Sequence, residues 1–137
     1  MQQRKQYDFT ASPFYNLKSK HKLAEILNLS LSELDKVERI ANTASKSYAV
    51  FTVGEKNREI QNPIHPLLRK TQTRIFTLLS RFCLPDYVHS GRKGHSFITN
   101  AKVHCDSTFI LTMDIEHFYA STRGEVAYQF FYHKMSI

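Results

Sequence analysis

The chain has 137 residues, 42% of them hydrophobic and 23% charged, which is ordinary for one soluble globular domain or a piece of a larger one. No apolar run reaches the roughly 18 to 20 residues that cross a bilayer, and the first residues lack the apolar stretch of a secretory signal. The net charge is +7, from nineteen Lys and Arg against twelve Asp and Glu. A basic surface attracts phosphate backbones because their neutralisation releases counterions, although the same charge also fits a basic protein without a nucleic-acid partner.

The two cysteines, Cys83 and Cys105, lie far apart in the sequence and form no CxxC pair. This usage fits a reducing, cytoplasmic location in which both act as small hydrophobic residues, and a disulfide between them stays open as the alternative. The seven histidines form no zinc pattern with these cysteines, so we expect no structural metal.

The first 45 residues predict a loose arm over residues 1–15, followed by two short helices. In KHKLAEILN, residues 20–28, three apolar side chains share one helical face. Ser30 and Glu33 form a capping-box signal for a second helix, in which Leu, Val and Ile follow at helical spacing. The pair could be a helix-turn-helix that binds DNA, but a helical hairpin is favoured because no third helix with base-reading side chains is evident.

Residues 48–53, YAVFTV, are rich in aromatic and β-branched types and predict a strand. The turn residues 54–57 and a return strand over 58–61, ended by Asn62 and Pro63, complete a predicted β-hairpin. Lys56 and Arg58 lie near its tip. A helix then begins near Pro66, because proline suits the first helical turn, and is expected to run to about residue 82.

This predicted helix has two distinct faces. Its basic residues Lys70, Arg74 and Arg81 fall within about 40° of each other at ~100° per residue. Such a helix would pack inward and present phosphate-binding charge outward, whereas a solvated basic face is the simpler alternative. The apolar arc consists of Leu67, Leu68, Ile75, Leu78, Leu79 and Phe82.

Residues 83–94 predict a loop that contains two cations, Arg92 and Lys93, between two glycines and so offers a weak phosphate-binding signal. Ser96 is expected to cap a helix that runs to about residue 105. Its candidate packing residues are Phe97, Ile98, Ala101 and Val103.

Residues 108–113, TFILTM, form a nearly continuous apolar run that fits a strand buried on both faces. Asp114 follows at its end, where a carboxylate is costly unless it binds a cation or accepts hydrogen bonds. Two interpretations are open from the residues alone: a metal ligand for phosphoryl transfer, or the N-cap of a helix over 116–120.

Several of these segments together resemble bacterial retron-type reverse transcriptases, in the expected order over roughly residues 15 to 132. FILTMDIEHFYAS is similar to the first carboxylate motif, where a strand ends in Asp and two aromatic residues follow. NREIQNP with LLRKTQTRIFTLL is similar to the fingers segment, and GRKGHSFITNAKVH to the stretch before the carboxylate. The lead-in before YAVFTV is similar as well.

The resemblance implies roles for individual residues. Asp114 matches the first metal-binding aspartate, and the backbone carbonyl of Ile115 the position that helps to hold the second cation. Tyr119 matches the aromatic gate that excludes a 2′-hydroxyl, although most relatives have Phe there. Arg58 matches the arginine that contacts the incoming dNTP, with Lys56 as a less certain helper. Asn100 and His104 match a family pattern without an assigned role.

The expected fold is therefore α+β: an N-terminal arm and helical pair over 1–45, fingers over 46–106, and the start of a right-hand palm over 107–137. The implied activity is RNA-directed DNA synthesis by two-metal nucleotidyl transfer, with Mg²⁺, dNTPs, an RNA template and a primer or RNA–DNA hybrid as partners. Lys70, Arg74, Arg81, Arg92 and Lys93 are the candidate nucleic-acid-binding residues. Retron relatives often serve in antiviral defence.

The family's Tyr-x-Asp-Asp hairpin does not occur in the sequence, so we expect the chain alone to be inactive. It would be a truncated product, an expressed fragment, or one piece of a longer or split enzyme that is completed by the remainder of the polymerase. A non-catalytic RNA-binding module and a helix-turn-helix protein are the alternatives, and no membrane partner is expected.

Overall fold

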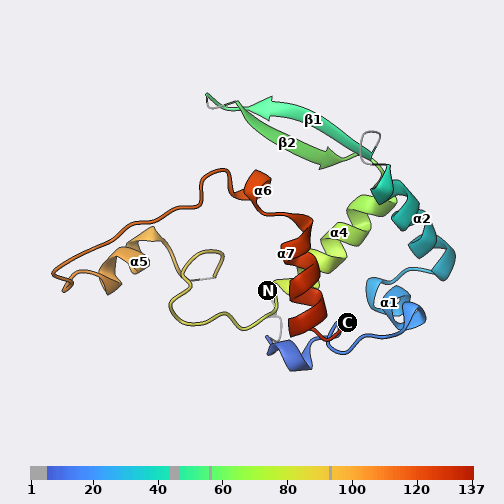
Figure 1. Cartoon of the computed structure of the whole chain (residues 1–137), viewed down its shortest axis with the longest axis horizontal. Helices are drawn as coiled ribbons and strands as arrows, with labels where there is room; N and C mark the ends of the chain where they lie inside the picture. The colour runs from blue at the N-terminus through green and yellow to red at the C-terminus, as the bar shows by residue number, and fades with distance from the viewer. Residues whose placement is uncertain (1–5, 44–46, 56, 93) are drawn as a thin grey trace.

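The chain forms an α+β fold, in which short helices and one antiparallel hairpin follow each other along the sequence (Figure 1). The structure, a computed structural model, describes residues 6–43, 47–55, 57–92 and 94–137, and of residues 119 and 120 it describes the backbone alone. Within these ranges, no helix is long and apolar enough to cross a membrane. The elements are η1 (Phe9–Ala11), α1 (Lys20–Leu27), α2 (Leu31–Asn42), β1 (Tyr48–Val53), β2 (Arg58–Pro63), α4 (Pro66–Leu79), α5 (Phe97–Val103), α6 (Phe118–Ser121), α7 (Gly124–Gln129) and the π-helical η2 (Phe130–Lys134).

The first two helices begin at side-chain caps. The Ser19 hydroxyl accepts a hydrogen bond from the Lys22 N–H at the start of α1, and Asn28 ends that helix in the left-handed conformation that asparagine tolerates. Ser30 and Glu33 form the predicted capping box at the start of α2, because each side chain accepts from the other residue's backbone N–H. The predicted helical pair is confirmed.

The core lies between α1, α2 and α4, which bury their apolar faces against each other. Leu68 and Leu78 of α4 are each 3% exposed, as the predicted apolar arc requires. The helix ends at Leu79, earlier than expected, although Phe82 beyond it is still buried. The other buried apolar residues are Phe14, Leu17, Ala24, Ile26, Leu27, Leu29, Leu34, Val37 and Met135.

The residues before α1 do not form the expected loose arm where the structure describes them. Tyr7 pairs with the chain just after α4: its N–H donates to the Arg81 carbonyl, and its own carbonyl accepts from the Cys83 N–H, both at 3.0 Å. The Tyr7 hydroxyl donates to the Leu78 carbonyl at 2.6 Å. Phe14 is buried. The arm therefore packs as part of the core, because its aromatic side chains find an apolar surface at the end of α4.

The predicted hairpin is confirmed, with Tyr48 opposite Pro63 and Val53 opposite Arg58. Its turn uses positive φ at Gly54, and the Asn57 N–H donates to the Gly54 carbonyl. The hairpin is fastened to α4 at its base, where the Gln72 side chain donates to the Tyr48 hydroxyl and Arg69 donates to the Pro63 carbonyl. Its tip extends away from α4 (Figure 1).

The last segment, α7 with η2, returns to the N-terminal residues. Met135 is fully buried, and its carbonyl accepts from the Asn16 N–H at 2.7 Å. Phe131 packs edge-to-face on Phe14, with ring centroids 6.5 Å apart. This return closes a long excursion of the chain, residues 84–123, on the core.

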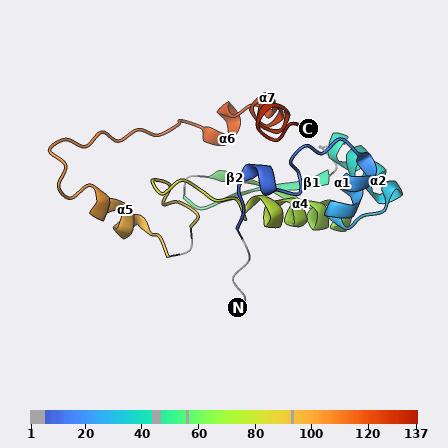
Figure 2. The same cartoon turned by 90° about the horizontal axis from the view of Figure 1, so that it is seen from below.

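The excursion extends to one side of the molecule in both views (Figures 1 and 2). Ser96 caps α5 as predicted, in a capping box with Thr99, but the expected packing residues of this helix are exposed, Phe97 by 84%. Residues 108–113 have no strand partner among the described residues and are irregular and exposed, so the expected buried strand is wrong here. A strand needs a neighbour to satisfy its backbone groups, and the single described sheet, β1 with β2, does not supply one. Cys83 and Cys105 are free and exposed, not buried as small hydrophobic residues.

Candidate functional site

Asp114 lies in the exposed stretch between α5 and α6, and not at the end of a buried strand. One of its carboxylate oxygens, Oδ1, accepts from the Ile115 N–H at 2.9 Å. The short helix α6 begins later, with His117 at its N-cap position, so the alternative in which Asp114 caps this helix is wrong as well. The carboxylate is open to solvent and keeps lone pairs for a further partner.

Tyr119, the expected gate residue, belongs to α6, and its side chain lies outside the described part of the structure. Ile115, the other expected neighbour of a cation, is exposed. The geometry of these residues around a nucleotide therefore stays a prediction.

Arg58 lies at the tip of the hairpin, where it is exposed and begins β2. It lines a shallow hollow together with Val53, Gly54, Glu55 and Ile60. This position leaves its guanidinium available to an anionic ligand. Lys56 lies outside the described residues.

The basic stripe of α4 is engaged in contacts within the protein. The Arg74 side chain donates to the Ile26 carbonyl at 2.9 Å, and the Lys70 ammonium donates to the Asn28 carbonyl at 3.3 Å. Both carbonyls belong to the C-terminal end of α1, where the helix dipole favours positive charge. The Arg81 guanidinium lies 4.8 Å from the centre of the Tyr7 ring. The expectation that this stripe simply faces outward is therefore corrected for Arg74 and Lys70, which hold α4 to α1.

The charge of Lys70 also reaches the start of α2. The pKa of Glu33 lies below its ordinary value, first because the Ser30 N–H donates to its carboxylate and the Ser30 hydroxyl lies beside it, and further because Lys70 is nearby. Lys70 thus makes a small contribution to the electrostatics of the helical pair.

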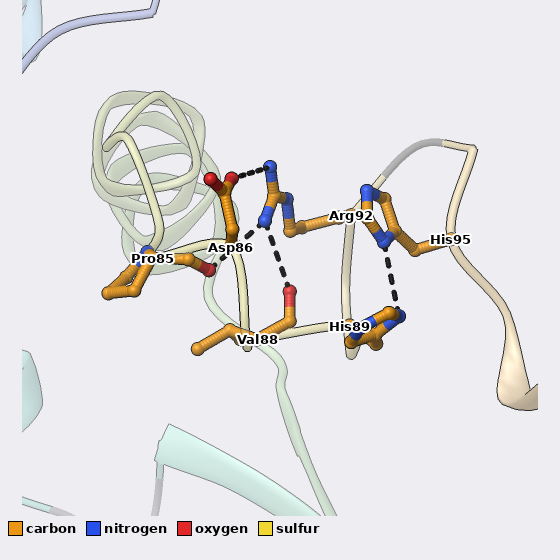
Figure 3. A network of polar contacts seen from close by, with 6 residues as sticks. All are labelled: Pro85, Asp86, Val88, His89, Arg92 and His95. Carbon is orange, nitrogen blue, oxygen red and sulfur yellow. Dashed lines mark hydrogen bonds and ion pairs between the residues drawn. The ribbon is translucent and has the colours of Figure 1, made fainter. Parts of the chain in front are cut away.

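Arg92, in the loop after α4, is likewise turned toward its own loop (Figure 3). It donates to the carbonyls of Pro85 and Val88 at 3.0 and 3.5 Å and pairs with the Asp86 carboxylate at 3.4 Å. These contacts close the loop on itself. Lys93 lies outside the described residues.

The expected site residues lie in three separate parts of the structure: the hairpin tip, α4 with the residues just after it, and the excursion over residues 84–123. Among the residues it describes, no group of three or more His, Cys, Asp or Glu side chains gathers where it could hold a metal ion. The arrangement offers accessible Arg58 and Asp114 side chains, and it does not assemble a catalytic centre from the described residues alone. Asn100 and His104, on and after α5, are exposed.

Comparison with known proteins identifies one relative whose name states its activity. The chain is 27% identical over 117 residues to the Retron Se72 reverse transcriptase of Salmonella heidelberg (strain 579083-10). The chain is distantly related to a retron reverse transcriptase. The match covers 82% of this chain and 29% of that protein, so the chain spans less than a third of its relative's length. No protein-family profile and no solved structure matches the chain.

Sequence reasoning missed the contacts that hold the hairpin to α4. Arg69 and Gln72, which anchor the hairpin to α4, carry no motif, and a helical wheel shows only that they lie off the apolar face. It also missed the pairing of His89 with His95, because the spacing of these residues belongs to no known metal or catalytic signature.

Proposed function

We propose that the chain is the N-terminal part of a retron-type RNA-directed DNA polymerase, with fingers over residues 46–106 and the start of the palm over residues 107–137. The observation that carries this proposal is the relationship to a retron reverse transcriptase over 82% of the chain. The resemblance of the segments around Arg58, residues 91–104 and Asp114 supports it, because they follow in the family's order, and it would give Arg58 a role in dNTP binding and Asp114 a role in metal binding. The substrates would be dNTPs and an RNA template with its primer.

The exposed apolar stretch before Asp114 supports the same proposal. Phe109 is 92% exposed and Met113 is 85% exposed, which is a costly state for large apolar side chains in water. The nearly continuous apolar sequence of residues 108–113 suits a strand that is covered on both faces. In the proposed enzyme, neighbouring palm strands would pair with residues 108–113 and so bring Asp114 to the edge of a sheet.

Magnesium is the cofactor that the proposal implies. Asp114 suits one of the oxygen ligands that Mg²⁺ prefers, because its carboxylate is accessible and only partly hydrogen-bonded. The described residues alone do not fit a metal pair, since no cluster of three or more ligating side chains occurs among them. In the family, the Tyr-x-Asp-Asp hairpin supplies the other carboxylates, and this sequence does not contain it.

Primer extension tests the activity that the proposal assigns to the chain alone. With an RNA template, a DNA primer, dNTPs and Mg²⁺, we expect no synthesis above background, because one aspartate is too few to hold the metal pair. Clear synthesis by the isolated chain, lost in Asp114→Ala, would show that the catalytic centre is complete and would overturn this part of the proposal.

The family assignment has a separate test in a chimera. Residues 15–132 would replace the corresponding segment of the Retron Se72 reverse transcriptase, and the chimera should extend a primer on its RNA template. We expect Asp114→Ala to abolish this activity, whereas Asp106→Ala, eight residues earlier, should retain it. A folded chimera whose activity is the same with and without the Asp114 carboxylate would contradict the proposed role.

The two alternatives make different predictions. A non-catalytic RNA-binding module would bind RNA equally well with Asp114→Ala and would bind no metal at this residue. A helix-turn-helix protein would bind duplex DNA through residues 30–40. The charge of α2 opposes this last function, because Glu33, Asp35 and Glu38 outnumber its two cations, Lys36 and Arg39, and would repel phosphate.

A further inference from the structure

Two tyrosines stack on the outward side of the last helical segment, α7 with η2. The rings of Tyr128 and Tyr132 lie nearly parallel, with an interplanar angle of 12° and centroids 5.8 Å apart. They are four residues apart in the chain, which makes them neighbours on a helix surface. The two residues are 58% and 54% exposed, and α7 lies at the outer edge of the molecule (Figure 2). The rings are therefore open to solvent although they contact each other.

Neighbouring phenylalanines determine which side of this segment faces outward. Phe131 packs edge-to-face on Phe14, and Phe130 packs in the same way on Phe9, with ring centroids 6.5 and 5.9 Å apart. These contacts hold one side of η2 against the N-terminal residues and leave the side of Tyr132 in water. The η2 turn is π-helical, a rare geometry that is frequent at functional sites.

The tyrosine pair offers flat aromatic faces to a ligand. In a parallel pair, each ring covers one face of its partner, so the other face of each ring remains available. The His133 ring adds a third aromatic surface, inclined at 84° to the Tyr132 ring with centroids 5.0 Å apart. Nucleobases stack on such rings with little dependence on sequence, because every base has a π-face. The row of rings therefore suits unpaired bases.

The charges on the same segment favour an anionic partner. Arg123 precedes α7 and Lys134 ends η2; both are exposed, and neither forms an ion pair with a carboxylate of the described residues. Glu125 is the acidic residue of α7, and its carboxylate accepts from the Gln129 side chain. Two unpaired cations beside exposed rings, on a chain of net charge +7, attract a phosphate backbone.

We propose that Tyr128 and Tyr132 form a stacking platform for unpaired bases of a single-stranded nucleic acid, with Arg123 and Lys134 contacting its phosphates. Stacking supplies the contact that a duplex cannot make, because the bases of a duplex are already paired and stacked on each other. The platform stands apart from the proposed polymerase activity, since the Asp114 carboxylate takes no part in it.

Binding of a fluorescein-labelled oligo(U) of about twelve nucleotides to the whole chain tests the proposal by fluorescence anisotropy. We expect Tyr128→Ala/Tyr132→Ala to weaken binding at least about fivefold, whereas Tyr128→Phe/Tyr132→Phe keeps both rings and should bind like the parent chain. Tyr128→Leu/Tyr132→Leu keeps apolar bulk without rings and should bind as weakly as the alanine variant. Tyr87→Ala removes an 82% exposed tyrosine of the loop after α4 and is the matched control, with the affinity of the parent chain.

Salt dependence measures the phosphate contacts separately. Arg123→Gln/Lys134→Gln should weaken binding and lower the slope of log affinity against log salt concentration by roughly 0.7 for each lost phosphate contact. Unlabelled duplex RNA of the same length should compete less well than the single strand.

The ring signals of the parent chain give a measurement that needs no variant. Stacked bases should move the ring proton signals of Tyr128 and Tyr132 upfield in NMR spectra when oligo(U) is added. Thermal melts of each variant should match the parent chain, as expected for exposed side chains. The proposal would be overturned by absence of oligo(U) binding to the parent chain, by equal affinity in the folded alanine variant, or by a leucine variant that binds like the parent. None of these results would change the outcome expected for the Asp114 chimera, which tests the polymerase proposal.

Discussion

The carboxylate of Glu33 closes the first turn of α2 onto Ser30. Its pKa is lower in the folded chain than the ordinary 4.5, so the unfolded chain binds the proton more tightly. The ionised carboxylate therefore stabilises the fold above about pH 4.5, and this contribution disappears as the pH falls through the lowered folded pKa.

We expect Glu33→Gln to flatten the fall in thermal midpoint between about pH 5 and 3, because Gln can accept the same hydrogen bond but does not titrate. Ser30→Ala should flatten it too and should cost about 1 kcal/mol at neutral pH through loss of the N-cap. A pH profile of both variants that parallels the parent chain would contradict the assigned role of the capping box.

The second prediction at this scale concerns Arg74. Because its side chain donates to the Ile26 carbonyl, a stability measurement can distinguish a structural role from nucleic-acid binding. Arg74→Ala should lower the free energy of unfolding by about 1.5 to 3 kcal/mol, as expected for a lost hydrogen bond from a charged group. Urea unfolding measures this change, with the exposed Lys36→Ala as the control. An unchanged stability together with weaker RNA binding would instead assign Arg74 to an RNA-binding surface.

At the scale of elements, the sequence predicts correctly those features that depend only on residues close together in the chain. Ser30 with Glu33 predicted the start of α2, Pro66 the start of α4, and Gly54 with Asn57 the hairpin turn, because caps and turns depend on neighbouring residues. The strand expected over residues 108–113 is not formed in the structure. A strand needs a partner strand, and the hydrophobic pattern of one segment does not reveal whether such a partner is present.

The same limit applies to the candidate site. The sequence predicts Arg58 near a hairpin tip and Asp114 at the end of a buried strand; Arg58 lies at the tip, whereas Asp114 lies in an exposed, irregular stretch. The sequence could not reveal that Lys70, Arg74 and Arg92 bind carbonyl groups of the protein, since those partners lie on other turns and helices and any residue type could supply them.

The exposed stretch gives the prediction at the scale of elements. Phe109→Ser with Met113→Ser should change the free energy of unfolding by less than about 0.5 kcal/mol, because neither side chain is covered. Light scattering should also show less self-association, since two large apolar groups leave the surface. Leu78→Ala, in the core, is the comparison and should cost about 2 to 5 kcal/mol. A comparable loss from the surface pair would mean that residues 108–113 are packed in solution.

At the scale of the whole molecule, the return of the last segment to the N-terminal residues joins the two ends of the described chain. Met135→Ala should lower the free energy of unfolding by about 2 to 5 kcal/mol, because the side chain is fully buried against the core. Tyr132→Ala, on the exposed side of η2, is the matched control and should cost far less. Hydrogen exchange over residues 124–137 should rise in Met135→Ala; exchange as slow as in the parent chain would contradict the packing of this segment.

The contacts of Tyr7 with Arg81 and Cys83 on one side, and of Asn16 with Met135 on the other, anchor both ends of a single large loop over residues 84–123. The entropy of closing such a loop grows only with the logarithm of its length, by roughly 0.6 kcal/mol for each doubling. Insertions, deletions and substitutions within the loop therefore cost the core little. Natural variation can reshape the part of the chain that carries Asp114 and the histidine pair while the helices that support it stay folded.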